Sequence, residues 1–155
     1  MTAITFLASS KPFIIPEEIL TYNDRTVFER MEDFIRLWVR EVDLDVWGEW
    51  IEGLFTLPYI YEISGADTPS FLLYLEKYFE EGDVLELLHC PNQNDFEYYR
   101  RKLKDAQEPI VINVGRLTFQ NSYGTYQLNP KKWVEELSHK NYLTEYGITT
   151  IVKYE

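Results

Sequence analysis

Three side chains in the sequence could act as a nucleophile or a base: His89, Cys90 and His139. A cysteine nucleophile needs a base within hydrogen-bond reach, and histidine supplies it most often. His89 and Cys90 are adjacent, so on a strand they project to opposite faces and cannot form that pair. Cys90 with His139 across the fold is the alternative, whereas a lone cysteine commonly packs as a small buried hydrophobe. These residues are the catalytic candidates of the sequence.

The motifs that identify familiar enzyme classes are absent from the sequence. It contains no GxGxxG, GxxxxGK[ST], GxSxG or HExxH pattern and no CxxC pair. Apart from the adjacent His89 and Cys90, no two histidine or cysteine residues have a spacing that suits zinc. We therefore predict no metal ion and no cofactor.

One acidic segment has the spacing of a calcium loop. Its acids occupy positions 1, 3, 5, 9 and 12, where such a loop places oxygen ligands, and they are Glu41, Asp43, Asp45, Glu49 and Glu52. Val46 stands where the loop needs glycine for its sharp turn, and the first position carries glutamate instead of aspartate. We interpret the segment as a solvated acidic surface and not as a metal site.

The same segment carries Trp47 and Trp50, in a chain with 16% aromatic residues. Tyrosine and tryptophan supply large, rigid contact area at protein interfaces, and surrounding carboxylates select a basic partner. Our leading hypothesis is therefore a protein-binding or regulatory module, such as an inhibitor of a basic protein. Its predicted binding residues are Trp47, Trp50, Asp43, Asp45, Glu49 and Glu52. The alternative is that these rings complete the core.

Two other functions stay open. The first is a small enzyme with a pocket lined by aromatic residues and carboxylates, in which His89 or His139 acts as acid or base. The second is a homodimer formed through the aromatic residues. A deep pocket at either histidine would favour the enzyme, and an acidic patch flanked by exposed rings would favour the binding module.

The net charge of −11 limits the partners. Residues 1–80 carry 6 Lys+Arg against 15 Asp+Glu, and residues 81–155 carry 9 against 11. This field repels the phosphates of nucleic acids and attracts basic proteins. The basic run from Arg100 to Lys104 is interpreted as a solvated helix face. We predict that the protein does not bind nucleic acid.

Cys90 is the single cysteine, which fits a reducing compartment and predicts a soluble, cytoplasmic protein. The apolar run at 4–8 is too short for a signal peptide or a membrane span. The length of 155 residues suits one globular domain spanning 1–155. No linker or repeat interrupts it.

Hydrophobic patterns and turn signals predict the elements that must position these candidates. Strands are expected at 4–8, 54–64, 84–90 and 148–152, and Pro58 places the second of them towards an edge or a bulge. Helices are expected from Pro16 to residue 23, after Thr68 and Pro69, after Asn94, and after Asn129 and Pro130. Segment 31–42 fits both a helix and a strand, and its apolar spacing favours the helix.

The last part of the chain predicts a three-stranded antiparallel meander at 110–128. Gly115 and Arg116 separate its first two strands, and the leading glycine suits a type II′ turn. Strands that alternate with helices and then cluster indicate an α+β fold. We expect a mixed or mainly antiparallel sheet with helices packed on one face.

Overall fold

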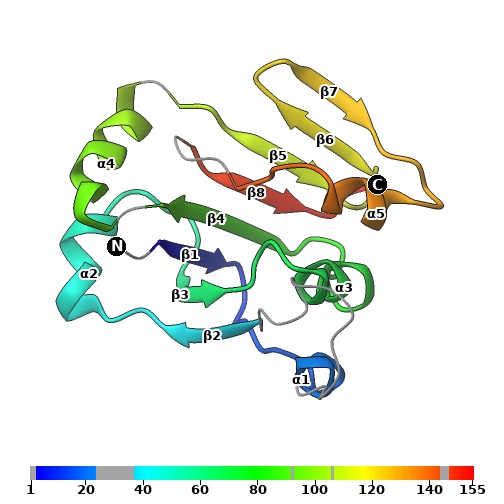
Figure 1. Cartoon of the computed structure of the whole chain (residues 1–155), viewed down its shortest axis with the longest axis horizontal. Coiled ribbons are helices and arrows are strands. Elements are labelled where there is room, and N and C mark those ends of the chain that lie inside the picture. Colours follow the sequence, from blue (N-terminus) through cyan, green and yellow to red (C-terminus); the bar gives the residue numbers. More distant parts are fainter. Residues whose placement is uncertain (1–2, 24–36, 92, 106, 144–146) are drawn as a thin grey trace.

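The fold is an eight-stranded mixed sheet with helices packed against it, seen in a computed structural model that describes residues 3–23, 37–91, 93–105, 107–143 and 147–155 (Figure 1). The strands are β1 (Ile4–Ser9), β2 (Trp38–Glu41), β3 (Tyr59–Ser64), β4 (Val84–Cys90), β5 (Ile110–Asn113), β6 (Thr118–Asn121), β7 (Gly124–Gln127) and β8 (Thr149–Val152). The helices are α1 (Glu17–Asn23), α2 (Leu44–Ile51), α3 (Pro69–Lys77), α4 (Phe96–Asp105) and α5 (Trp133–Ser138), and a 3₁₀ turn, η2 (Gln93–Asp95), precedes α4. The predicted α+β class is confirmed.

The strands lie in the order β2-β3-β1-β4-β8-β5-β6-β7. Of the strand pairs that the described residues form, β5 and β8 run parallel and the other six are antiparallel. The final strand β8 thus enters the middle of the sheet, between β4 and β5. The predicted meander is present as β5, β6 and β7.

Alternation along β1 and β4 sends apolar side chains to both faces of the sheet. Leu7 is paired with Leu87 on the first face, which α1, α3 and α5 cover. Phe6 is paired with Leu88 on the second face, which α2 and α4 cover. The expectation of helices on one face was therefore wrong, because strands buried on both sides need cover on both sides.

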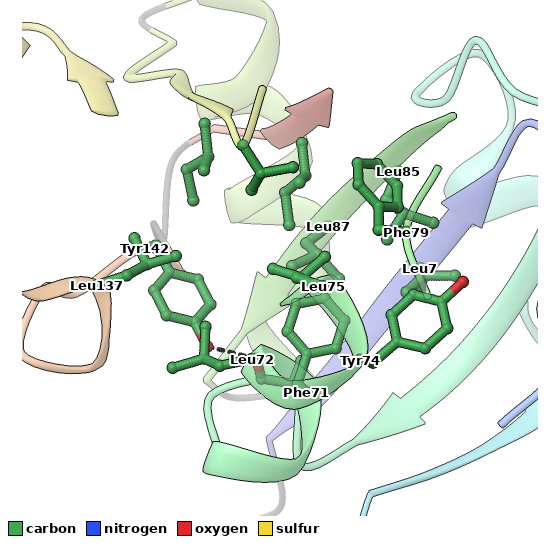
Figure 2. Packing of buried hydrophobic residues seen from close by; sticks show 14 of the residues in the cluster. Leu7, Phe71, Leu72, Tyr74, Leu75, Phe79, Leu85, Leu87, Leu137 and Tyr142 are labelled. Atoms are coloured by element: carbon green, nitrogen blue, oxygen red, sulfur yellow. Dashed lines mark hydrogen bonds between the residues drawn. The ribbon is translucent and has the colours of Figure 1, made fainter. Parts of the chain in front are cut away.

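Helix α3 provides much of the core on the first face (Figure 2). Thr68 is its N-cap and Pro69 its first residue, as predicted, although the Thr68 hydroxyl donates to the carbonyl of Gly65 and does not cap the helix. The side chains of Phe71, Leu72 and Leu75 point towards the sheet. The packing of α3 therefore also positions Asp67, which lies just before the helix in the chain.

The structure corrects three local predictions. Trp38–Glu41 form a strand, so the favoured helix does not extend through this part, while residues 31–36 lie outside the described residues. β3 lies between β2 and β1, so the edge position, one of the two alternatives inferred from Pro58, is wrong, and Pro58 directly precedes the strand. The β5–β6 hairpin has no type II′ turn at Gly115, because the positive φ occurs at Leu117 and the Asn113 side chain accepts from the N–H groups of Gly115 and Arg116.

Candidate functional site

The predicted binding residues gather on and around α2, and together with the exposed residues Leu44 and Val46 they form what we call the α2 surface: Asp43, Leu44, Asp45, Val46, Trp47, Glu49, Trp50 and Glu52. Asp43 is the N-cap, and its Oδ1 accepts the N–H of Asp45 at 3.0 Å. This bond satisfies a free donor of the first turn and helps to start the helix. The acidic residues are therefore held by a capped helix.

The two tryptophans of α2 differ in role. Trp47 is half-buried and packs edge-on against Phe6, with ring centroids 5.4 Å apart, and against Phe96 of α4 at 5.5 Å. Trp50 contacts Phe96 at 5.9 Å but remains 39% exposed. Trp47 thus anchors α2 to the sheet, whereas Trp50 presents part of its ring to solvent.

Apolar and acidic side chains alternate around the exposed side of α2. Leu44 is 64% exposed and Val46 57%, while Asp45 and Glu49 are exposed four residues apart on one helix face. Leu44 also borders a shallow pocket of about 240 Å³ beside the exposed ring of Tyr59. An acidic stripe flanked by exposed apolar side chains is the pattern that favours a binding surface.

The basic helix α4 borders the α2 surface without covering its acidic stripe. Arg100 directs its guanidinium to the backbone carbonyl of Glu52 at 3.3 Å, at the C-terminal end of α2. Lys102 lies over the ring of Tyr98, 5.8 Å from its centroid. Both contacts are made to groups other than the carboxylates of Asp45 and Glu49, and these two acidic side chains remain exposed.

The catalytic candidates lie elsewhere. His89 and Cys90 project to opposite faces of β4, as strand alternation requires. Cys90 is buried among the α2 and α4 residues, whereas His139 is the exposed C-cap of α5 on the other side of the sheet. The structure therefore does not bring Cys90 and His139 together.

Both histidines line surface pockets that share one wall, Asp67. A groove of about 820 Å³ runs between α3 and α5, with His139, Trp133, Glu76 and Asp67 among its lining residues. A smaller pocket of about 350 Å³ is lined by Asp67, His89 and Tyr142. We call the larger of these the α3–α5 groove.

Tyr142 forms the buried wall beside Asp67. Its hydroxyl donates to the carbonyl of Ala66 at 2.7 Å, the bond drawn as a dashed line in Figure 2. Burial, together with the negative charge of Asp67, raises the pKa of Tyr142 above its usual value. Tyr142 stays protonated and fixes the loop carrying Asp67, so it acts as a structural support and not as a general base.

The sequence did not identify three residues of this groove: Asp67, Glu76 and Trp133. No local motif connects them, because α3 and α5 are brought together only by packing on the same face of the sheet. Within the described ranges, no three histidine, cysteine or carboxylate side chains are placed to hold a metal ion. None of the helices in those ranges is long and apolar enough to cross a membrane.

Comparison with protein family models, curated proteins and solved structures finds no match for this chain. Its function is therefore inferred from the geometry of the α2 surface and the α3–α5 groove.

Proposed function

We propose that this protein is a cytoplasmic binding module that holds a basic protein segment on its α2 surface. The observation that carries the proposal is the pairing of two stripes on one short helix. Asp45 and Glu49 supply negative charge, and Val46 and Trp50 supply exposed apolar area one position further along. A partner that offers lysine or arginine beside apolar side chains would satisfy both stripes.

The charge of the surrounding chain supports a basic partner. Residues 37–91 carry 2 Lys+Arg against 12 Asp+Glu, which is a net charge of −10 out of the −11 of the whole chain. Such a field raises the encounter rate with a cationic protein and opposes the approach of nucleic acid. The partner would therefore associate quickly at low ionic strength and more slowly in salt.

The role of each residue follows from its exposure. Trp50 is the anchor, because a tryptophan that is already packed on one side loses little conformational freedom when a partner covers the other. The shallow pocket beside Leu44 and Tyr59 would receive one apolar side chain of the partner. Asp45 and Glu49 would orient the partner and set the rate of association.

The test is affinity capture from a native cell extract at low and high salt, with mass spectrometry of the retained proteins. The informative variant is Asp45→Asn with Glu49→Gln, which removes two charges and keeps the shape of the helix. Its matched control is Glu80→Gln with Glu81→Gln, which removes two exposed acids from the turn after α3. A basic protein retained by the wild type and the control but lost from the α2 variant supports the proposal. Equal retention by both variants contradicts it.

The second candidate function is an enzyme that uses the α3–α5 groove. The observation in its favour is that His139 lines a groove of about 820 Å³ together with Trp133 and the carboxylates of Asp67, Glu76 and Glu135. His139 would serve as acid or base and the carboxylates would bind the substrate. A metabolite that raises the melting temperature of the wild type but not of His139→Asn or Asp67→Asn would support this function. Stabilisation that survives both substitutions would place the ligand elsewhere.

A further inference from the structure

Among the residues that the structure describes, no strand pairs with the outer edge of β7. It is the last strand in the order, and all four of its residues are exposed. The stretch 121–128, with sequence NSYGTYQL, contains no charged residue and no proline. The opposite edge, β2, carries Arg40 and Glu41. Charges and prolines are the usual means by which a protein blocks strand addition, and the β7 edge has neither.

The hydrogen bonds of the β6–β7 hairpin determine which backbone groups of β7 face outward. Leu128 donates its N–H to the carbonyl of Leu117 at 2.7 Å, so these two residues form a hydrogen-bonded pair. Hydrogen-bonded and non-hydrogen-bonded pairs alternate along an antiparallel ladder. Tyr126 therefore bonds inward to Phe119, whereas Thr125 and Gln127 direct their N–H and C=O groups away from β6.

These outward groups are complementary to a second copy of themselves. When two β7 strands run antiparallel about a two-fold axis beside Tyr126, Thr125 of each copy faces Gln127 of the other. Each such pair exchanges two backbone hydrogen bonds, which gives four in total. A register centred on Thr125 would instead require the N–H of Tyr123, which already donates to Oδ1 of Asn121 at 2.9 Å. The register centred on Tyr126 is therefore the one that satisfies the free groups.

Side chains on the first face of the sheet favour the same arrangement. Tyr126 is 44% exposed and packs against Phe119, with ring centroids 6.4 Å apart. The ammonium of Lys140 lies 5.1 Å from the centroid of each of these rings. In the two-fold arrangement Tyr126 faces its own copy as a non-hydrogen-bonded pair, the closest cross-strand position. The exposed part of each ring would thereby be buried against the other.

The charge distribution permits two copies to approach at this edge. The net charge of −10 in residues 37–91 includes β2, β3 and β4. Four strand spacings separate β7 from β4, about 19 Å at 4.8 Å each. That distance exceeds the screening length of about 8 Å at physiological salt. Contact through β7 therefore keeps the acidic halves of two copies at opposite ends of the joined sheet.

We propose that two copies of this chain associate through β7, antiparallel and centred on Tyr126, to form one continuous sheet. The pairing within β7 involves only residues 125–127 of each strand, so the dimer is weak and its population depends on concentration. This self-association is independent of the α2 surface, which lies on helices of the other face. A partner on α2 and a second copy on β7 can therefore bind at the same time.

The first test measures mass by sedimentation over a range of protein concentrations. The wild type is expected to rise from 18.5 kDa towards twice that mass. Thr125→Pro removes an outward N–H and leaves the β6–β7 ladder intact, so it should stay at the mass of one chain. Thr125→Val keeps that N–H and should behave as the wild type. A wild type that stays at 18.5 kDa throughout, or a Thr125→Pro variant that still dimerises, overturns the proposal.

The second test determines the register by disulfide trapping. Copies of residue 126 would have Cα atoms about 4.5 Å apart, within the span of a disulfide. Copies of residue 125 would be separated by about 8 Å, beyond that span. Mild oxidation should therefore link Tyr126→Cys into covalent dimers and leave Thr125→Cys as single chains, with the buried Cys90 of the wild type as background. Faster linking of Thr125→Cys would overturn the proposed register.

Discussion

The carboxylate of Glu86 accepts the backbone N–H of Thr56 at 2.9 Å and fastens the segment between α2 and β3 to the sheet. The same oxygen accepts the N–H of Leu57 at 3.2 Å, and the second oxygen accepts the hydroxyl of Thr56 at 3.2 Å. Glu86 lies on β4 and is buried, an unusual environment for a carboxylate. Its three hydrogen bonds offset the cost of removing it from water.

Replacing Glu86 should distinguish its hydrogen bonds from its charge. Glu86→Leu removes every acceptor and should lower the free energy of unfolding by about 1–3 kcal/mol. Glu86→Gln keeps an acceptor for the two N–H groups and should cost less than about half of that. Urea denaturation of the wild type and both variants measures the difference. Equal losses in the two variants would show that the charge, and not the hydrogen-bond pattern, stabilises this segment.

The elements with strong local signals could be predicted from the sequence. β4 was predicted with its full extent, and α3 with its N-cap, because a bounded apolar run and a Thr-Pro pair act over a few residues. Helix α5 begins at Trp133, three residues after the proline that was expected to open it. Trp38 lies in a strand although its spacing also fits a helix, because pairing with β3 outweighs a weak local preference.

Contacts between distant parts of the chain could not be predicted. The insertion of β8 beside β4 depends on packing across the whole sheet, and no residue near Thr149 signals it. Asp67 and His89 line the same pocket only because β3 and β4 end at the same side of the fold. Glu86 did carry a signal, since a single acid within an apolar strand needs a buried partner or an exposed face.

Two glycines should respond in opposite directions to alanine. At Gly48, within α2, an added Cβ would meet its nearest neighbour, the Cβ of Leu44, at 3.8 Å, an ordinary contact. Gly48→Ala should therefore stabilise the protein by about 0.5–1 kcal/mol through the helix preference of alanine.

At Gly147 the same substitution meets the backbone of another segment. The added Cβ would lie 2.4 Å from the carbonyl oxygen of Glu108, so the two segments would have to separate. We expect a loss of about 1–3 kcal/mol, comparable to overpacking a core. Thermal unfolding of both variants beside the wild type measures the effect. A Gly147→Ala variant as stable as Gly48→Ala would contradict the close approach of these segments.

The stability of the fold should decrease at alkaline pH because of Tyr74. Burial, with smaller contributions from Asp83 and Glu80, raises the pKa of Tyr74 from 10.0 to about 12. The folded state therefore holds the proton more tightly than the unfolded chain. The contribution of Tyr74 to the free energy of unfolding is fully present below pH 10. It is lost as the pH rises towards 12, at about 1.4 kcal/mol per pH unit. Free energies of unfolding, measured by urea denaturation between neutral pH and pH 11, should show this slope.

Tyr74→Phe is the variant that isolates the contribution of this residue, since its ring still packs against Phe13 and Phe71. Above pH 10, the free energy of unfolding of this variant should fall less steeply with pH than that of the wild type, because one fewer group loses a proton. Tyr123→Phe, which changes an 89% exposed ring, should keep the slope of the wild type. An unchanged slope in Tyr74→Phe would show that other groups account for the alkaline loss.

An exposed ion pair between α1 and the end of α3 should show the opposite pH dependence. Glu18 of α1 accepts hydrogen bonds from the ammonium of Lys77 at 2.7 Å and from the hydroxyl of Tyr78, and so connects α1 to the end of α3. These bonds, that of Lys77 foremost, lower the pKa of Glu18 below its usual value. The contribution of these bonds to the stability of the folded state is therefore present at neutral pH and is lost as the pH falls through this lowered pKa. In an NMR titration, Lys77→Met should raise the midpoint of the Glu18 carboxyl carbon, whereas Lys104→Met, on a different helix, should leave it unchanged. A midpoint that does not move in Lys77→Met would contradict the ion pair between α1 and α3.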